Sequence, residues 1–468
     1  GKHDTMSFVL AVPYPAQGHV SPMQQFAKRL MAKGVEVTLV TTKYLFKTAH
    51  FEQSSVAIET ISDGDDDHTL KPKSLKDYLS KFEAVATREL SEMIEKLKRS
   101  GQTVSAIVYD ALMPWILGVA RKFGILAVVF STQSCTVNAL YYLVQKGLLP
   151  LPLSSTFSLP GLPLLDVSDQ PSYLSENGYE LYPIIRDTML RQFVDFDDVD
   201  WVVFNVFYEL EPEMVDWMAK LVRVAAVGPL VPSMLLDRRL EHDRSYGLNL
   251  FVSESDMAMK WLQDKPAGSV VYVSFGSIAE LGEAQMAEVA LGLKVTGYYF
   301  IWVVRKTEER KLPENYASEM SGKVLIVNWC SQLEVLMEES VGCFVTHCGF
   351  NSILEAMSLG VPMVAMPQWA DQPTNAKFVE DVWEVGIRAR QDESGTVRGE
   401  VVAECVREVM EGEKGKKMRR NCMKWKESAR MTADAGGNLD KSISDFVASL
   451  FGNNETSKTP SVCSVVYE

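Results

Sequence analysis

Short apolar segments rich in β-branched residues alternate along the chain with longer amphipathic segments, and this alternation constrains the fold most. In the first half it predicts strands at residues 8–12, 35–41, 104–109 and 126–130, and helices at 22–33 and 114–123. Gly34 and Gly124 follow those two helices, as is typical of helix ends. Repeated βαβ units form a parallel sheet with helices on its faces, so an α/β fold is predicted.

A second series of the same kind follows, with strands predicted at 269–274, 298–304, 323–327, 343–346 and 363–365. The chain has 468 residues, more than the roughly 250 to 300 at which one hydrophobic core stops growing. Two doubly wound domains are therefore predicted. We expect an N-terminal domain at 1–240, a linker at 241–250, a C-terminal domain at 251–436, a helix at 437–452 that packs back on the N-terminal domain, and a mobile tail at 453–468.

Two stretches interrupt this pattern. Residues 149–170 are rich in Pro, Leu and Ser and lack a clear period, which predicts an irregular surface loop. Residues 227–243 contain Pro229 and Pro232 and end in a run of charged residues, which is typical of a linker.

The charge balance and the apolar segments argue against two classes of partner. Lys and Arg number 47 against 61 Asp and Glu, so a net charge of −14 repels a phosphate backbone, and no basic block offsets it. The longest apolar stretch, at 111–120, has about half of the roughly 20 residues that a membrane-spanning helix needs. The apolar run at 8–12 is too short for a secretory signal. We expect a monomeric, cytoplasmic protein without nucleic-acid or membrane partners.

The seven cysteines are scattered along the chain without any C-x-x-C motif. They form neither a disulfide framework nor the spacing of a zinc site. We expect reduced, mostly buried thiols and no metal site.

The most informative segment is residues 329–372, which read WCSQLEVLMEESVGCFVTHCGFNSILEAMSLGVPMVAMPQWADQ. A predicted strand runs into His347 and Gly349, and a helix is predicted to start near Asn351 or Ser352. The free N–H groups of a helix start, with the positive end of its dipole, can hold a diphosphate without a basic surface. Gly349 lets a ligand approach the backbone closely, and an imidazole N–H adds a further donor.

Two more residue types in this segment suit a nucleotide. Trp329 offers a flat face on which a base can stack, and Glu355, predicted on the first helical turn, can accept both hydrogens of a ribose diol. Each residue alone also has an ordinary structural interpretation: Trp329 as a core aromatic, Asn351 as a helix cap, Glu355 as a solvated charge. Their combination favours a nucleotide-binding site.

Over its full length the segment resembles the signature box of plant family 1 UDP-sugar glycosyltransferases. The resemblance implies the GT-B fold, in which two facing doubly wound, Rossmann-like domains hold the UDP-sugar mainly in the C-terminal one and the acceptor in the N-terminal one. It also implies a set of UDP-sugar-binding residues: Trp329 and Cys330 at the uracil, Gln332 and Glu355 at the ribose, His347, Asn351 and Ser352 at the diphosphate, and Asp371 and Gln372 at the sugar hydroxyls.

The same resemblance extends outside the box. It places Ser277, just after the strand predicted at 269–274, at the diphosphate, although a simple turn is the ordinary alternative there. Thr132 matches a family position that touches the sugar or its phosphate, and Gln372 as the last residue of the box marks glucose as the donor sugar. Two residues depart from the family pattern: Ser331 stands where Pro is usual, and Phe350 where Trp is usual. We expect these departures to tune affinity and to leave function intact.

Sugar transfer to an alcohol or an acid needs a base that takes the acceptor proton, and histidine titrates near neutral pH. Of the six histidines, His19 follows the first predicted strand, and Asp110 follows the strand at 104–109. Both therefore lie at the edge where doubly wound folds bind ligands, and the carboxylate can fix the imidazole tautomer. Helix capping is the ordinary alternative for both residues. The phrases QGHVSP and DALMPW match the family's catalytic motifs, so the resemblance makes His19 and Asp110 the catalytic pair.

The predicted reaction is a single inverting displacement that uses UDP-glucose as donor and needs neither a metal nor another cofactor. Its product is a β-glucoside or a glucose ester of a small lipophilic acceptor. The chain looks most like the family members that act on benzoic acids, thiohydroximates and triterpenoids or steroids. By positional analogy, the candidate acceptor-binding residues are Tyr14, Met113, Tyr179, Ile278 and Trp369, each with core packing as the ordinary alternative.

Two other functions stay open. A metal-dependent glycosyltransferase would use a D-x-D motif, and such triplets occur at 63–65, 65–67, 195–197 and 198–200, although charge runs in so acidic a chain usually face water. A non-catalytic protein that binds UDP-sugar would keep the box and lack transfer. A dinucleotide oxidoreductase is disfavoured because G-x-G-x-x-G is missing after the first strand, and a serine hydrolase because G-x-S-x-G is missing.

Overall fold

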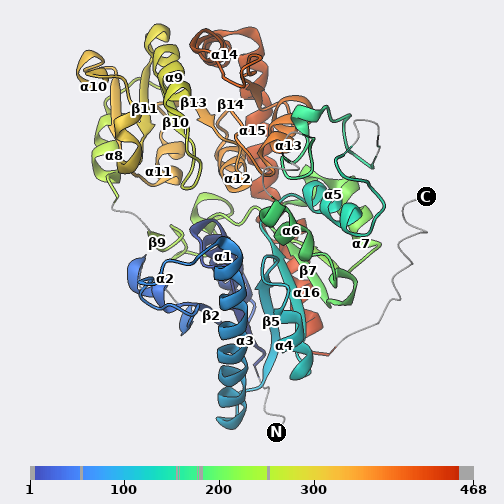
Figure 1. Ribbon diagram of the computed structural model, residues 1–468. Coiled ribbons are helices and arrows are strands. Elements are labelled where there is room, and N and C mark those ends of the chain that lie inside the picture. Colours follow the sequence, from blue (N-terminus) through green and yellow to red (C-terminus); the bar gives the residue numbers. More distant parts are fainter. Residues whose placement is uncertain are drawn as a thin grey trace. The chain divides into compact units, whose positions relative to one another are not determined.

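The computed structural model describes residues 6–52, 56–153, 157, 159–176, 178, 183–249 and 253–452, and the chain forms two compact units (Figure 1). Unit 1 comprises residues 1–164, 173–250 and 430–468, and unit 2 comprises residues 165–172 and 251–429. The segment 165–172 thus groups with the second unit, although the sequence placed it inside the N-terminal domain. The tail predicted at 453–468 and its mobility lie outside the described residues.

Unit 1 contains a seven-stranded sheet in the order β4-β2-β1-β5-β6-β7-β8. All its neighbouring strands pair in parallel. The central strands are almost entirely buried, because helices cover both faces of such a sheet. The strands are β1 (Phe8–Val12), β2 (Glu36–Thr42), β4 (Ala57–Ile61), β5 (Val104–Asp110), β6 (Leu126–Ser131), β7 (Trp201–Phe204) and β8 (Val224–Ala226), with an antiparallel pair of β3 (His50–Phe51) and β9 (Leu248–Asn249) beside them.

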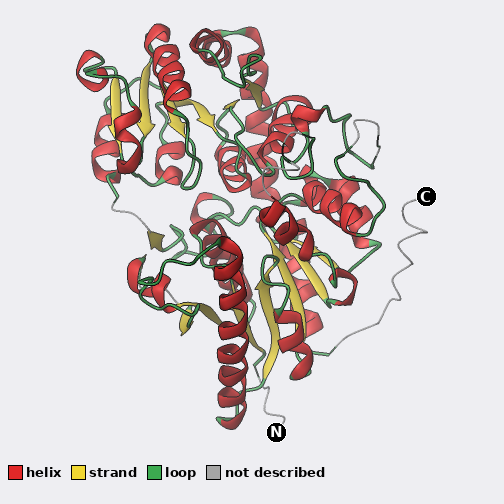
Figure 2. Ribbon diagram, in the orientation of Figure 1, coloured by secondary structure: helices red, strands yellow, loops and turns green. Residues whose placement is uncertain are grey.

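The helices of unit 1 flank these strands (Figure 2). They are α1 (Gln17–Ala32), α2 (Lys43–Thr48), α3 (Leu75–Arg99), α4 (Ile116–Lys122), α5 (Cys135–Gln145), α6 (Pro183–Arg191), α7 (Pro212–Ala219) and α16 (Asn438–Leu450), with short 3₁₀ turns η2 (Phe196–Asp198), η3 (Tyr208–Leu210) and η4 (Ser233–Leu235). The helix α15 (Glu413–Ala433) carries the chain from unit 2 back to unit 1.

Unit 2 is built around a six-stranded parallel sheet in the order β12-β11-β10-β13-β14-β15. Its strands are β10 (Val270–Ser274), β11 (Tyr299–Val303), β12 (Val324–Val327), β13 (Val341–Thr346), β14 (Met363–Ala365) and β15 (Gly386–Arg388). Its helices are α8 (Ser255–Gln263), α9 (Glu283–Thr296), α10 (Tyr316–Glu319), α11 (Gln332–Met337), α12 (Phe350–Leu359), α13 (Gln372–Lys377) and α14 (Gly399–Glu411), with the short turns η1 (Val167–Asp169), η5 (Lys306–Lys311) and η6 (Phe378–Val382). Trp302 and Val345 lie fully inside its core.

Each sheet has one point at which the strand order reverses direction. In unit 1 this switch point lies between β1 and β5, and in unit 2 it lies between β10 and β13. The connections leave such neighbouring strands in opposite directions, so the carboxyl ends of the two strands border a crevice in which doubly wound folds bind their ligands. The predicted α/β class with two doubly wound domains is confirmed.

Two expectations about local structure were wrong. The first helix starts at Gln17, ahead of the predicted start at Pro22, so His19 lies in a helical turn and not in a loop. Pro22 occupies the helix interior, where it omits one intrahelical hydrogen bond.

The stretch at 227–243 is not a free linker, because two carboxylates in it pair with α1. Asp237 binds Arg29 at 2.8 Å and Asp243 binds Lys28 at 2.9 Å, and both carboxylates are buried.

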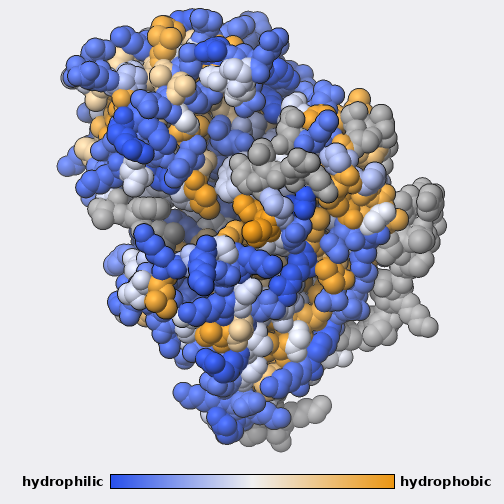
Figure 3. Space-filling view, viewed as in Figure 1, coloured by the Kyte–Doolittle hydropathy of each residue, from blue (hydrophilic) through white to orange (hydrophobic). Residues whose placement is uncertain are grey.

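The face drawn in Figure 3 is mostly hydrophilic, and its hydrophobic residues lie in separate groups. No helix within the described residues is both long enough and apolar enough to cross a membrane. Six cysteines are buried and carry free thiols, and the seventh, Cys463, lies outside the described residues.

Candidate active site

A first candidate site lies at the switch point of unit 1. The loop after β1 leads into α1, which carries His19 as its third residue, and Asp110 is the last residue of β5. Since β1 and β5 are parallel neighbours, their carboxyl ends bring these two side chains together. Thr132 directly follows β6, the next strand of the same sheet, and is half-buried.

A short hydrogen bond joins His19 Nδ1 to Asp110 Oδ2 at 2.7 Å. The Asp110 carboxylate is almost fully buried, and it also accepts the backbone N–H of Tyr14 at 3.3 Å and that of Leu112 at 3.0 Å. The imidazole is 24% exposed, so it faces a space that a ligand can reach. Two backbone N–H groups therefore fix the carboxylate, and the carboxylate fixes the imidazole.

The hydrogen bond to Asp110 fixes the role of each ring nitrogen of His19. An ionised carboxylate accepts only, so Nδ1 carries the proton and Nε2 is the basic nitrogen of the neutral ring. A proton gained at Nε2 creates an imidazolium, which the buried carboxylate stabilises. This is the geometry of a general base with an orienting carboxylate.

Aromatic rings form a wall beside the pair. The Tyr14 ring lies 5.5 Å from the His19 ring and 6.5 Å from Phe82, measured between centroids. Phe82 in turn packs against Tyr78 and Trp115, each at 6.0 Å. Burial raises the pKa of Tyr14, and Asp110 adds to this rise, so its phenol stays protonated and can donate a hydrogen bond.

The residues predicted to bind the acceptor are divided between the two units. Tyr14 lies beside His19. Met113 is buried, and its N–H donates to the carbonyl of Asp110. Ile278 and Trp369 belong to unit 2, where Ile278 is 65% exposed and Trp369 is half-buried. Tyr179 lies outside the described residues.

A second candidate site lies at the switch point of unit 2. Ser277 follows β10 and His347 follows β13, and the two strands are parallel neighbours. A Cβ placed on Gly276 would lie 2.6 Å from His347 Nε2, so the turn that carries Ser277 touches the imidazole. Arg305, just after β11, donates to the carbonyls of Ser277 and Ala279 at 2.8 and 2.6 Å and fixes that turn.

The glycine before α12 makes room for the His347 ring. A Cβ on Gly349 would lie 2.7 Å from His347 Nε2, while the backbone there, at φ −58°, suits any residue. Gly349→Ala should therefore displace the imidazole without straining the backbone. Loss of a hydrogen bond to a charged group costs about 1.5 to 3 kcal/mol, so we expect the KM for the nucleotide substrate to rise by about 10-fold to 150-fold. Steady-state kinetics check this, and an unchanged KM in a folded variant would show that the ring has no part in nucleotide binding.

Burial lowers the pKa of His347 to about 4, from an ordinary value of 6.5. The unfolded chain therefore binds a proton that the folded protein excludes, and the free energy of unfolding should fall as the pH drops from about 6.5 toward 4. His347→Asn should reduce this acid sensitivity. Thermal unfolding of both proteins at about pH 7.5 and about pH 5 measures the effect, with His50→Ala, at an exposed position, as a control. Equal acid losses in His347→Asn and the parent protein would contradict it.

A hydrogen-bonded cluster connects three of the predicted UDP-sugar residues. Gln332 Nε2 donates to Ser352 Oγ at 3.0 Å and to Glu355 Oε1 at 3.1 Å, while Gln332 Oε1 accepts the Tyr272 hydroxyl at 3.1 Å. The helix α12 begins at Phe350, so Asn351 and Ser352 lie in its first turn, and Glu355 lies in the second turn and not in the first as predicted. The helix start directly follows the turn after β13, so it lies at the same switch point.

The residues at the start of the box lie just beyond β12. Trp329 is half-buried, and its carbonyl accepts the N–H of Glu254 at 2.9 Å. Cys330 is buried, which raises the pKa of its thiol to about 12 and leaves the backbone as its binding group. Ser331 caps α11, and its N–H donates to Ser255 Oγ at 2.8 Å, a bond that proline at this position would lack. Phe350 is buried in unit 2.

Asp371 and Gln372 lie at the start of α13. Gln372 Oε1 accepts the backbone N–H groups of Gln368 at 2.9 Å and Trp369 at 3.1 Å, which orients its amide nitrogen away from them. The Asp371 carboxylate accepts from Asn375 Nδ2 at 3.0 Å, and Asn375 also donates to the carbonyl of Cys348. The end of the box is therefore tied to the turn that carries His347.

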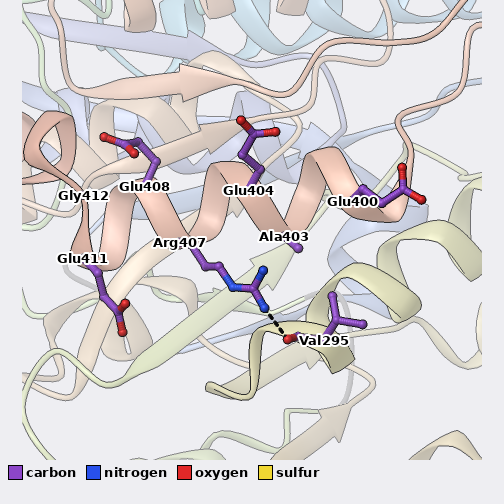
Figure 4. A pocket seen from close by; sticks show the side chains of 8 residues that line it. All are labelled: Val295, Glu400, Ala403, Glu404, Arg407, Glu408, Glu411 and Gly412. Atoms are coloured by element: carbon purple, nitrogen blue, oxygen red, sulfur yellow. Dashed lines mark hydrogen bonds between the residues drawn. The ribbon is translucent and has the colours of Figure 1, made fainter.

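A pocket of about 460 Å³ lies elsewhere on unit 2, between α14 and the end of α9 (Figure 4). Its lining consists of Val295, Glu400, Ala403, Glu404, Arg407, Glu408, Glu411 and Gly412, and it shares no residue with the predicted nucleotide site. Arg407 donates to the carbonyl of Val295 across it. The pocket is acidic and does not suit a diphosphate.

Sequence reasoning missed the residues that hold the predicted ones in place. Arg305 follows β11, directly beside β10, so its position at the carboxyl edge was a usable signal. Tyr272 and Asn375 have no such signal, because their contacts with Gln332 and Asp371 depend on tertiary packing.

Comparison with known proteins agrees with this geometry. Residues 254–427 match the family described as UDP-glucoronosyl and UDP-glucosyl transferase, and residues 16–113 match the glycosyltransferase family 28 N-terminal domain. Mogroside I-E synthase of Siraitia grosvenorii is 47% identical, over 94% of this chain and 98% of that protein. A flavonol 7-O-beta-glucosyltransferase of Arabidopsis thaliana is 42% identical over the same shares.

Solved structures show the same similarity. The crystal structure of Os79 from O. sativa in complex with UDP has a TM-score of 0.90 and 38% identity, and it covers 94% of this chain and 100% of that one. Os79 in complex with U2F and trichothecene matches with a TM-score of 0.87 and 37% identity, over 94% of this chain and 100% of that one.

Proposed function

The chain belongs to the plant UDP-glycosyltransferases of family 1, and from this premise we propose that it transfers glucose from UDP-glucose to a small lipophilic acceptor with inversion at C1. The proposal rests mainly on the hydrogen bond between His19 and Asp110 at one switch point. At the other switch point, His347 lies beside the turn that carries Ser277 and the start of α12. The first arrangement supplies a base, and the second suits a diphosphate.

His19 acts as the general base. As the acceptor oxygen attacks C1 of the α-linked glucose, its proton moves to Nε2, and Asp110 stabilises the imidazolium that results. The bond between C1 and the diphosphate oxygen breaks, and UDP leaves with the electron pair. Attack on the face opposite UDP gives the β-glucoside, or a glucose ester where the acceptor is a carboxylic acid.

The nucleotide is proposed to bind in unit 2. Trp329 and Cys330 receive the uracil, Gln332 and Glu355 the ribose, and Asp371 and Gln372 the glucose hydroxyls. The charge that develops on the diphosphate is met by Ser277, His347 and the start of α12, where Asn351 and Ser352 lie. His347 stays neutral near pH 7 because burial lowers its pKa, so it contributes as a hydrogen-bond donor and not as a cation.

The acceptor is proposed to bind in unit 1, beside the aromatic wall of Tyr14, Tyr78, Phe82 and Trp115. Such a wall suits an apolar or aromatic ring system, and the Tyr14 phenol can donate to a polar group on it. Thr132 is proposed to touch the sugar or its phosphate. The relatives named for a mogroside and for a flavonol fit a lipophilic acceptor that carries a hydroxyl group. The cytoplasmic location and the monomeric state stay predictions.

The test is an acceptor panel of phenols, benzoic acids, flavonols and terpenoid alcohols with UDP-glucose, read by mass spectrometry. We expect at least one glucoside, with the anomeric coupling of a β-linkage in its proton NMR spectrum. Turnover should persist in EDTA, since helix-start and side-chain donors are proposed to meet the leaving charge; loss of turnover would favour the D-x-D alternative. Of those triplets, Asp63 already accepts from His68 and Tyr78 at 2.7 and 3.1 Å. Binding of UDP-glucose with no product from any acceptor would favour a non-catalytic protein.

A further inference from the structure

Residues 165–172, called here the brace segment, come from the first half of the chain and yet group with unit 2. The segment was expected to end an irregular surface loop, but Leu165, Asp169 and Gln170 in it are buried. Its short turn η1 contacts α13, the helix whose start carries Asp371 and Gln372. An eight-residue piece of the N-terminal half is thus part of the fold around the end of the box.

One end of the brace segment makes two hydrogen bonds to the backbone of Ala370 in the box, called here the clasp. Ser172 Oγ accepts the N–H of Ala370 at 2.6 Å, and the N–H of Ser172 donates to the carbonyl of Ala370 at 2.9 Å. Ala370 has φ +59°, a left-handed conformation that costs a residue with a side chain about 1 to 3 kcal/mol. The clasp holds Ala370 in this conformation, immediately before Asp371.

The middle of the segment is anchored by an ion pair. Arg388 donates to Asp169 Oδ1 and to the carbonyl of Ser168, both at 2.8 Å, and Asp169 is buried. The carbonyl of Asp169 accepts the Thr374 hydroxyl at 2.8 Å, so the same residue also binds the helix α13. The brace segment therefore touches the residue before Asp371 and a residue of the first turn of α13.

A further attachment of this region comes from α13. Asn375 joins the Asp371 carboxylate to the carbonyl of Cys348, next to His347. The loop that presents Asp371 and Gln372 is thus fixed on one side to the diphosphate end and on the other to the brace segment. Loss of the attachment to the brace segment frees one side of the loop. It leaves in place the residues proposed to contact the diphosphate and the uracil.

We propose that the brace segment sets the recognition of the donor sugar, with Ser172 and Asp169 as positioning residues that hold Asp371 and Gln372 toward the glucose hydroxyls. The proposal rests on the proposed function, in which these two residues bind the sugar. Ser172 and Asp169 lie outside the box, in the range 1–240 that was predicted to form the acceptor-binding domain.

Ser172→Ala tests the proposal, because it removes one side-chain hydrogen bond and keeps the backbone half of the clasp. A neutral hydrogen bond contributes about 1 kcal/mol, so we expect the KM for UDP-glucose to rise by about fivefold. The inhibition constant for UDP, which lacks the sugar, should stay within about twofold of the parent value. The preference for UDP-glucose over UDP-galactose should also fall. Ser168→Ala, in the same segment with an exposed side chain, is the matched control and should change none of these values.

A second variant, Asp169→Asn, weakens the ion pair with Arg388 and should shift the same ratio of UDP-glucose KM to UDP inhibition constant in the same direction. The proposal is overturned if Ser172→Ala and Ser168→Ala give the same ratio, or if UDP and UDP-glucose weaken equally. Calorimetric titration with UDP and UDP-glucose reads the same ratio without turnover. A failure of the proposed function, seen as no product from any acceptor, is therefore distinct from a failure of this inference.

Discussion

His19→Ala is expected to lower the rate constant for glucosyl transfer by about 10² to 10⁴-fold, the usual contribution of a general base. The variant loses the nitrogen that takes the acceptor proton under this mechanism, and the Asp110 carboxylate loses its imidazole partner. The affinity for UDP should not change, because the residues proposed to bind UDP lie in unit 2. Initial rates with UDP-glucose and calorimetry with UDP separate the two quantities.

A matched histidine variant controls for this result. His50 lies exposed in β3, so His50→Ala should match the parent protein in both rate and UDP affinity. A rate for His19→Ala within about twofold of the parent value would remove His19 as the base. Loss of UDP affinity together with rate would instead point to a disturbed fold.

Asp110→Asn is expected to lower the same rate constant by as much as about 10⁴-fold, the loss seen when the orienting carboxylate of a histidine base becomes an amide. An amide can donate to Nδ1, which favours the tautomer with its proton on Nε2 and blocks that nitrogen as a base. It also removes the negative charge that stabilises the imidazolium. The KM for UDP-glucose should change little, because the effect acts on the proton transfer and not on the nucleotide.

Stability must be measured beside this rate, since the Asp110 carboxylate also accepts the N–H groups of Tyr14 and Leu112. The thermal unfolding midpoint of Asp110→Asn should fall by only a few degrees, because one amide oxygen still accepts a hydrogen bond there. A folded variant with parent-like turnover would contradict the orienting role of Asp110.

Hydrophobic periodicity predicted four of the seven strands of the first sheet and five of the six strands of the second, because buried parallel strands are continuous apolar runs. It missed β4, β7, β8 and β15. The strands predicted at 8–12 and 363–365 match β1 and β14 to the residue. Helix starts were less predictable. Pro22 suggested a first helical residue, but the helix extends to Gln17, where the carbonyl of Ala16 accepts two N–H groups without any capping side chain.

The switch-point residues were predictable because the edge of a parallel sheet is set by where each strand ends. His19, Asp110, Ser277 and His347 all follow or end strands, and the structure places each pair together. The supporting contacts were not predictable. Neither Ser172 nor Arg388 shows any local signal of its bond to the box, since those bonds depend on how distant segments pack. The stretch at 227–243 looked like a linker because Arg29, the partner of Asp237 on α1, lies about 200 residues away in the chain.

His19 and Asp110 are proposed to act as one proton-accepting unit, and a double-mutant cycle on the transfer rate constant tests this most directly. The four proteins are the parent, His19→Ala, Asp110→Asn and the double variant, assayed with saturating UDP-glucose and one accepted acceptor. Because Asp110 acts through the imidazole, the double variant should be no slower than His19→Ala alone, within about threefold. Rate losses that multiply in the double variant would show that the two residues work independently and would contradict the account.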